Sequence, residues 1–171
     1  MQIFEVRFTS KPSAMLYPAL QERLNTQHLA LVHILQGLPE SRLLQEVRPG
    51  KWSIHQQVCH LAAIQPVYGQ RFIAIAESTG PVILQQYVGD VDPFFLELCG
   101  LPLPAVLSTL SEGRLQLQEL AQGFTASDFG KTCEHPLYGH LSLRELLEFF
   151  VLHEAHHLFE IFKMAHLKPS N

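Results

Sequence analysis

The chain has 171 residues, of which 47% are apolar and 16% charged, with a formal net charge of −4 and a pI of about 6.2. This length is sufficient for one domain with its own core, so we expect residues 1–171 to form a single domain. The twelve Lys and Arg residues do not cluster, which argues against a nucleic-acid partner. No apolar run approaches the roughly 18 residues of a membrane span, and the low charged fraction favours a homodimer.

Cysteine usage and the N-terminus indicate a cytoplasmic protein. Cys59, Cys99 and Cys133 are far apart and form no C-x-x-C pattern, which excludes a disulfide framework or a cysteine zinc site. The opening MQIFEVRF contains a glutamate and an arginine within its apolar stretch, unlike a signal peptide. Its alternation of apolar and polar residues predicts an extended arm within residues 1–12.

The first two helices are predicted over residues 16–36 and 53–77. Leucines at helical spacing define the inward face of the first helix, which ends at Gly37. In the second helix, Ser53 and Gln56 form a capping box, and Pro66 removes one backbone donor inside it.

Residues 78–101 contain much Gly, Pro and Asp, which predicts a long crossing loop. A third helix is predicted over residues 104–122 and a fourth over 142–166, where Ser142 and Glu145 form a second capping box. Little strand signal lies between these helices. The predicted fold class is therefore all-α, a four-helix bundle with a long loop between its second and third helices.

The fourth helix carries the stretch VLHEAHHLFE at residues 151–160. At about 100° per residue, His153 and His157 fall within the apolar stripe, whereas His156 points away from it. Two buried imidazoles could be core side chains bonded to backbone carbonyls or water, but rings four residues apart can also converge on one cation. We therefore favour a metal site.

The same stretch matches H-E-x-x-H, the signature of zinc proteases, with Glu154 as the general base. The extended form of that signature needs Gly and His where this chain has Glu160 and Lys163. We therefore regard the match as accidental. Glu160, the only acid on the inward stripe, is instead a candidate to hydrogen-bond a metal-ligating histidine and hold its ring in orientation, as a second-shell residue.

A metal site needs a third ligand from another helix of the bundle. The candidates are His28 and His33 on the first helix and His55 and His60 on the second. His55 lies in a first helical turn, where exposure to solvent is expected. Geometry alone favours His60 and leaves His28 and His33 open.

Two motifs, GKWSIHQQVCHLA at residues 50–62 and GHLSLRELLEFFVLHEAHHLFEIFKM at 139–164, resemble the DinB/YfiT-like superfamily of four-helix-bundle metalloproteins. The resemblance extends over about residues 13–166. It implies a metal held by His60, His153 and His157, and dimers formed through helix faces. The arm at residues 1–12 has no counterpart in the resemblance.

Three nitrogen ligands leave a coordination position open, as in catalytic sites. On zinc or nickel, that position can activate a low-molecular-weight thiol or water, and the resemblance implies an enzyme of small molecules, with thiol S-transfer ranked ahead of hydrolysis. The alternative is a bundle whose metal is only structural, or a sensor. Specificity is expected to lie in the loops at 78–101 and 123–141.

Five further side chains are predicted to lie outside the metal site. Cys59 is predicted to be a small core residue and Trp52 to pack over the start of the second helix. His135, His140 and His166 are predicted to lie at the surface.

Overall fold

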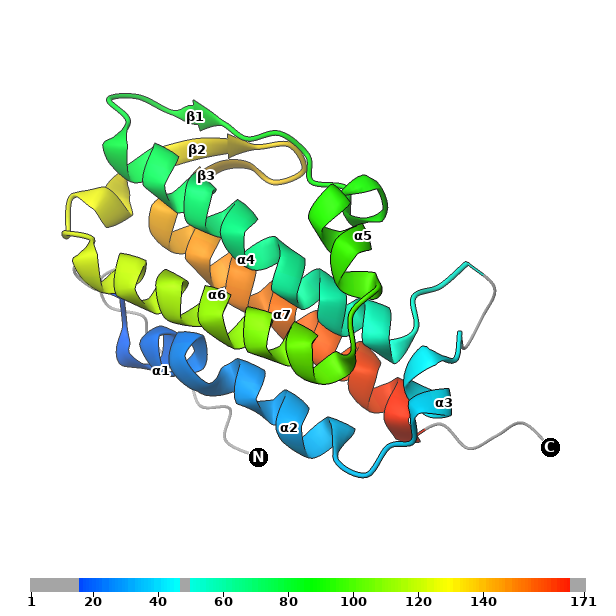
Figure 1. Ribbon diagram of the computed structural model, residues 1–171. Coiled ribbons are helices and arrows are strands. Elements are labelled where there is room, and N and C mark those ends of the chain that lie inside the picture. The colour runs from blue at the N-terminus through cyan, green and yellow to red at the C-terminus, as the bar shows by residue number, and fades with distance from the viewer. Residues whose placement is uncertain (1–15, 47–49, 167–171) are drawn as a thin grey trace, which may run out of the picture.

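The computed structural model describes residues 16–46 and 50–166, and its main body is a bundle of long helices (Figure 1). These helices are α1 (Pro18–Thr26) continued through η1 (Gln27–Leu29) into α2 (Ala30–Leu35), then α4 (Ile54–Glu77), α6 (Leu103–Gly123) and α7 (Leu143–His166). The predicted four-helix bundle is confirmed, and the arm expected at residues 1–12 lies outside the described residues. The helices of the described chain include none that is long and apolar enough to cross a membrane.

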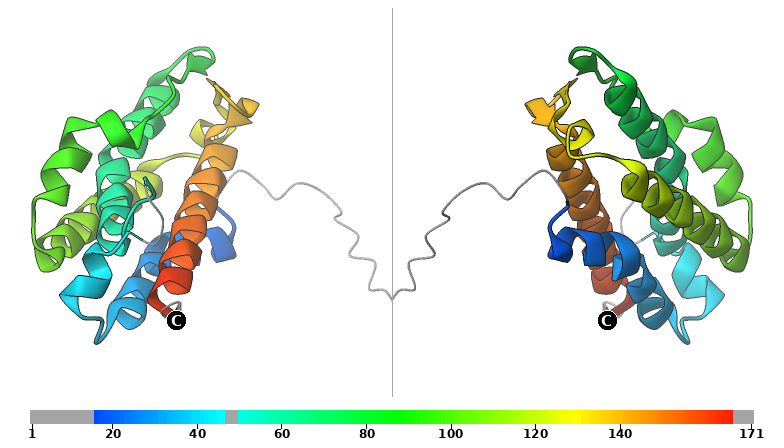
Figure 2. Two further views of the ribbon diagram at one scale, coloured as in Figure 1. Left: turned by 90° about the vertical axis from the view of Figure 1, so that its right-hand side faces the viewer. Right: turned by 90° about the vertical axis from the view of Figure 1, so that its left-hand side faces the viewer.

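The direction of the helices explains the long loop. In Figure 1, α4 and α6 run the same way along the bundle, opposite to α7 and to α1 and α2. The chain must therefore return along the bundle between α4 and α6. This return segment contains β1 (Val82–Ile83), η2 (Gly89–Val91) and α5 (Pro93–Cys99), and Figure 2 shows α5 on the outer side of α4.

A small sheet, which the sequence analysis did not predict, lies beside the bundle. β2 (Thr132–His135) and β3 (Gly139–Ser142) form an antiparallel hairpin that follows η3 (Asp128–Gly130), and β1 pairs parallel to β2. The strands have only two to four residues, too few for a pattern of alternating polarity to be recognised. A tight turn joins β2 to β3, and Gly139 at its end has a φ of +66°, which favours glycine.

The helix starts follow the predicted capping chemistry. Ser53 accepts from the backbone N–H of Gln56, whose side chain accepts from the N–H of Ser53 at 2.8 Å. Ser142 and Glu145 make the same reciprocal pair. Three short elements were not predicted from the sequence: α3 (Glu40–Leu44), the 3-10 turn that interrupts the first helix, and α5 within the expected loop.

The core is divided into two apolar clusters. One contains Leu24, Tyr68 and Phe150, and the other contains Leu31, Val58 and Ile161. A set of buried polar side chains that we call the polar layer lies between them along the helices; it consists of His28, Gln65, Arg114 and Glu154. The polar layer and the candidate site occupy the same middle part of the bundle.

Candidate metal centre

Three histidines from two antiparallel helices meet in the middle of the bundle. His60 lies on α4, and His153 and His157 lie one turn apart on α7. The Nε2 atom of His153 is 3.5 Å from that of His60 and 3.1 Å from that of His157. His60 and His157 are buried, and His153 is partly exposed. We call this group the histidine cluster.

The spacing of the cluster fits a shared metal ion. Nitrogen ligands at about 2.0–2.1 Å from a tetrahedral ion are about 3.3–3.4 Å apart. The two Nε2 separations in the structure, 3.1 and 3.5 Å, lie on either side of that value. All three ligand atoms lie within 4.8 Å of one another. The residues present therefore match the donor set of a three-histidine site.

Gln57 sets the orientation of one ring. His157 Nδ1 contacts Gln57 Oε1, and because a carbonyl oxygen only accepts, Nδ1 must carry the proton. The lone pair of His157 is then on Nε2, which faces the other two rings. Partners of this kind fix the tautomer of metal-ligating histidines.

Burial keeps the three imidazoles unprotonated. It lowers the pKa of His60 and of His153 to about 4, and the neighbouring histidines add to the effect. For His157, burial and the rings of His153 and His60 lower the pKa to about 2. The cluster therefore presents neutral nitrogen donors at neutral pH, the form that binds metals.

The outer side of His60 is covered by the return segment. Trp52 packs on His60 with ring centroids 4.8 Å apart, and its indole N–H donates to Asp90 at 2.7 Å. A Cβ placed on Gly89 would lie 3.1 Å from His60 Nδ1, so this position has little room for a side chain. Within the described chain, the buried Nδ1 atoms of His60 and His153 have no hydrogen-bond partner.

Glu154, the glutamate of the H-E-x-x-H match, lies in the polar layer and not in the cluster. It forms a buried ion pair with Arg114 of α6 and also accepts from Gln27 at 2.9 Å. Arg114 donates further to Gln65 at 3.2 Å and to the carbonyl of Leu24 at 3.1 Å. A carboxylate committed to these partners cannot serve as the general base of a protease, in agreement with the view that the match is accidental.

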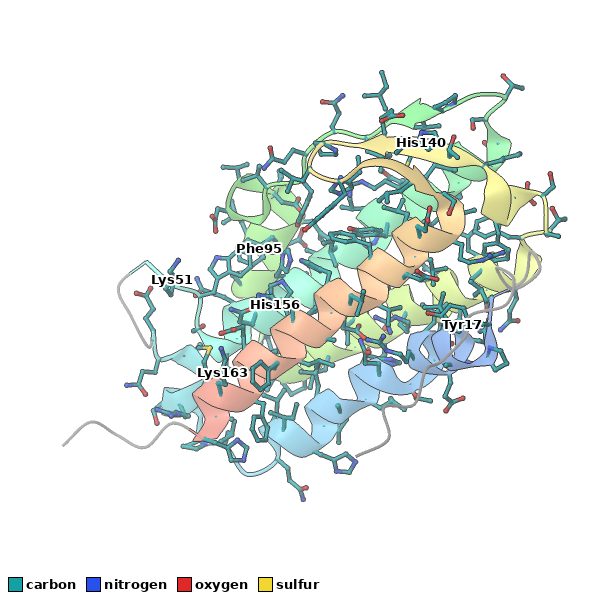
Figure 3. All side chains as sticks on the ribbon, turned by 180° about the vertical axis from the view of Figure 1, so that it is seen from behind. Tyr17, Lys51, Phe95, His140, His156 and Lys163 are labelled. Carbon is teal, nitrogen blue, oxygen red and sulfur yellow. The ribbon has the colours of Figure 1, made fainter. Side chains whose placement is uncertain are left out.

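The other candidate ligands lie away from the cluster. His28 is buried beside Arg114, at 3.3 Å, and His33 is exposed. Glu160, considered as a second-shell partner, pairs instead with Lys163 at 2.6 Å on the surface. Figure 3 shows α7 from behind, with His156 and Lys163 labelled along it. His156 is exposed, as its position on the helix predicted.

Two histidines expected at the surface are buried. His55 is 5% exposed, and its Nε2 lies 2.9 Å from the carbonyl oxygen of Leu101. His135 is 8% exposed; its ring packs on Tyr138 and Phe149, and its Nδ1 accepts from two backbone N–H groups of the hairpin turn. His140 and His166 are exposed, and Cys59 is a buried core residue, as predicted.

Several polar residues around the site were not predicted from the sequence. Gln57 precedes His60 by three residues on α4, a spacing that places both on one face. Arg114 falls at an inward position between Leu110 and Leu117, and a lone arginine there is a usable signal of a buried pair. Asp92, which accepts from the Tyr87 hydroxyl at 2.7 Å, lies in the return segment and gives no such signal.

The fold and the cluster define a helix-bundle protein with a three-histidine centre of the kind that binds transition metals. The model of the DinB superfamily matches residues 23–161, and the chain belongs to that family. This confirms the resemblance seen in the sequence.

Two solved structures are similar in fold. YfiT from Bacillus subtilis, described as a probable metal-dependent hydrolase with an unusual four-helix bundle topology, matches with a TM-score of 0.74 at 20% identity, over 91% of each chain. TT2238, described as a four-helix bundle protein, matches with a TM-score of 0.62 at 22% identity, over 84% of this chain and 95% of the other. The comparison with curated proteins yields no match.

Proposed function

We propose that the protein is a metal-dependent hydrolase in which His60, His153 and His157 hold a divalent transition metal, zinc or nickel. The observation that carries the proposal is the convergence of three neutral Nε2 atoms from two helices. The description of YfiT as a probable metal-dependent hydrolase supports the same reaction class.

A metal held there supplies Lewis-acid chemistry, which lowers the pKa of water toward neutrality and polarises a carbonyl. The protein contributes the arrangement around it. Gln57 holds the His157 ring in one tautomer, and the apolar surroundings keep the imidazoles unprotonated. Asp90 and Asp92 accept hydrogen bonds from Trp52 and Tyr87, the two rings that pack against His60, and so hold these rings in place beside the cluster.

Activation of a low-molecular-weight thiol for S-transfer uses the same ligands, and it is the second candidate function. Thiolates are good ligands for zinc and nickel, so a metal held by His60, His153 and His157 would also be suited to bind a thiol. The family resemblance supports this candidate, and a direct assay distinguishes it from hydrolysis.

The test begins with elemental analysis of protein purified without an affinity tag. We expect close to one equivalent of zinc or nickel, lost in His157→Ala and kept in His156→Ala, an exposed histidine next to it on α7. The metal-loaded protein is then assayed against esters and amides, and against an electrophile together with low-molecular-weight thiols. Turnover of esters or amides that disappears on chelation supports the hydrolase, and thiol-dependent turnover alone supports the transferase. Metal binding without any turnover would mean that the metal is structural or that the protein is a metal sensor.

A further inference from the structure

Aromatic side chains border the histidine cluster on the side of the return segment. Trp52 and Tyr87 flank His60, with ring centroids 4.8 and 5.8 Å from it. Each ring is held at its polar end by an aspartate, Trp52 by Asp90 and Tyr87 by Asp92, both at 2.7 Å. These anchored rings form a fixed wall beside the cluster.

A second group of aromatic rings leads from the cluster to the hairpin. Phe149 lies 6.2 Å from His153 between ring centroids, and Tyr138 lies 5.1 Å from Phe149. Tyr138 and its neighbour Leu137 are 59% and 71% exposed at the hairpin turn. His153 is the most exposed ring of the cluster, and the Phe149 and Tyr138 rings lie on its side.

The charges near the cluster are negative. Asp90 and Asp92 accept hydrogen bonds from the two rings that pack against His60, so two carboxylates lie just behind this side of the cluster. The arginine in the middle of the bundle, Arg114, is bound to Glu154. Carboxylate and phosphate substrates are usually held by arginine or lysine, and in the described part of the chain the ring and hydrogen-bond contacts of the three histidines include neither.

We propose that the substrate is an uncharged molecule with an aromatic group, which packs between the Trp52–Tyr87 wall and the Phe149–Tyr138 rings while its reactive group reaches the histidine cluster. This inference rests on the proposed function and specifies its substrate class. Uncharged aromatic amides and esters satisfy the apolar contacts and do not meet repulsion from the two aspartates.

Trp52 is the only tryptophan of the chain, so its fluorescence reports binding at this site without any turnover. The metal-loaded protein is titrated with phenylacetamide and with succinamate, an anionic amide without a ring. We expect phenylacetamide to change the emission and to bind at least tenfold more tightly than succinamate. Tyr138→Ser should weaken phenylacetamide binding about three- to tenfold, whereas Leu115→Ser, at an exposed leucine on α6, should leave it unchanged.

Two results would overturn the inference: succinamate binding as tightly as phenylacetamide, or equal phenylacetamide affinity in Tyr138→Ser and the unchanged protein. Neither depends on catalysis. If the aromatic preference is observed but no ester or amide is hydrolysed, the proposed reaction is wrong and the binding preference stands. If hydrolysis is observed without the preference, only the substrate class is wrong.

Discussion

The buried ion pair of the polar layer offers a direct test of how the bundle is stabilised. Replacing Arg114 by methionine keeps a long apolar side chain but leaves the carboxylate of Glu154 without its cation. Arg114 is 0% exposed and Glu154 1% exposed, so water cannot replace the lost partner without opening the core. The remaining donor to Glu154 is Gln27, at 2.9 Å, which carries no charge.

The size of the effect follows from this burial. Removing one partner of a buried pair costs about 3–5 kcal/mol of unfolding free energy, because the other charge stays behind uncompensated. For a chain of this size, that corresponds to a fall in Tm of roughly 6–20 °C. Replacing both Arg114 and Glu154 by methionine removes the stranded charge, so the double variant should be more stable than the single one. It should stay below the original protein, because Gln27, Gln65 and His28 still lose partners.

Urea denaturation and thermal unfolding followed by circular dichroism measure these differences. Lys163→Met provides the matched control, since Lys163 and Glu160 form an exposed pair that is worth at most about 1 kcal/mol. A loss below 1 kcal/mol in Arg114→Met would refute the reasoning, because it would mean that Glu154 remains solvated or finds another cation.

Three further predictions concern the histidine cluster and the surface. Gln57→Leu removes the acceptor of the His157 Nδ1 proton and should weaken metal binding about 10- to 100-fold in a chelator competition, whereas unchanged affinity would exclude this role for Gln57. The metal-free protein should lose stability from pH 7.5 to 5.5 in urea titrations, because the unfolded chain takes up protons that a native His157 with a pKa lowered to about 2 does not. This loss should shrink by about 1 kcal/mol in His157→Gln and stay the same in His140→Gln, at an exposed histidine; equal losses in both variants would contradict it. Phe159, 59% exposed on α7, belongs to an apolar face suited to the expected homodimer, and Phe159→Glu should halve the mass measured by light scattering, whereas a dimer that persists would place the interface elsewhere.

Local signals made the bundle and the cluster predictable from the sequence. Capping boxes at Ser53 and Ser142 mark the starts of α4 and α7 because the chemistry involves residues three apart. The inward direction of His153 and His157 follows from helical periodicity alone. His60 was favoured over His28 and His33 only modestly by geometry, because the rotation of α4 against α7 depends on contacts between distant residues.

The features that were missed depend on such distant contacts. Arg114 reaches residues of three other helices, and nothing near it in the sequence identifies Glu154 as its partner. His55 was expected in solvent because it is in a first helical turn, but the carbonyl of Leu101, after α5, covers it. The aspartates at positions 90 and 92 lie near the cluster only because the chain must return along the bundle between α4 and α6.

The polar layer also fixes the axial position of each helix relative to its neighbours. Arg114 is satisfied by atoms of α1, η1, α4 and α7 at a single level, so a slip of α6 by one turn, about 5.4 Å, would bury a guanidinium opposite leucine and phenylalanine. Aliphatic side chains alone could pack at several axial offsets between the helices. A buried guanidinium cannot, because it needs its carboxylate and hydrogen-bond partners at one level. The same restriction holds α7 at the axial position where His153 and His157 face His60 on α4. Arg114 lies outside the histidine cluster, yet its pairing with Glu154 selects the helix arrangement in which a metal can be bound.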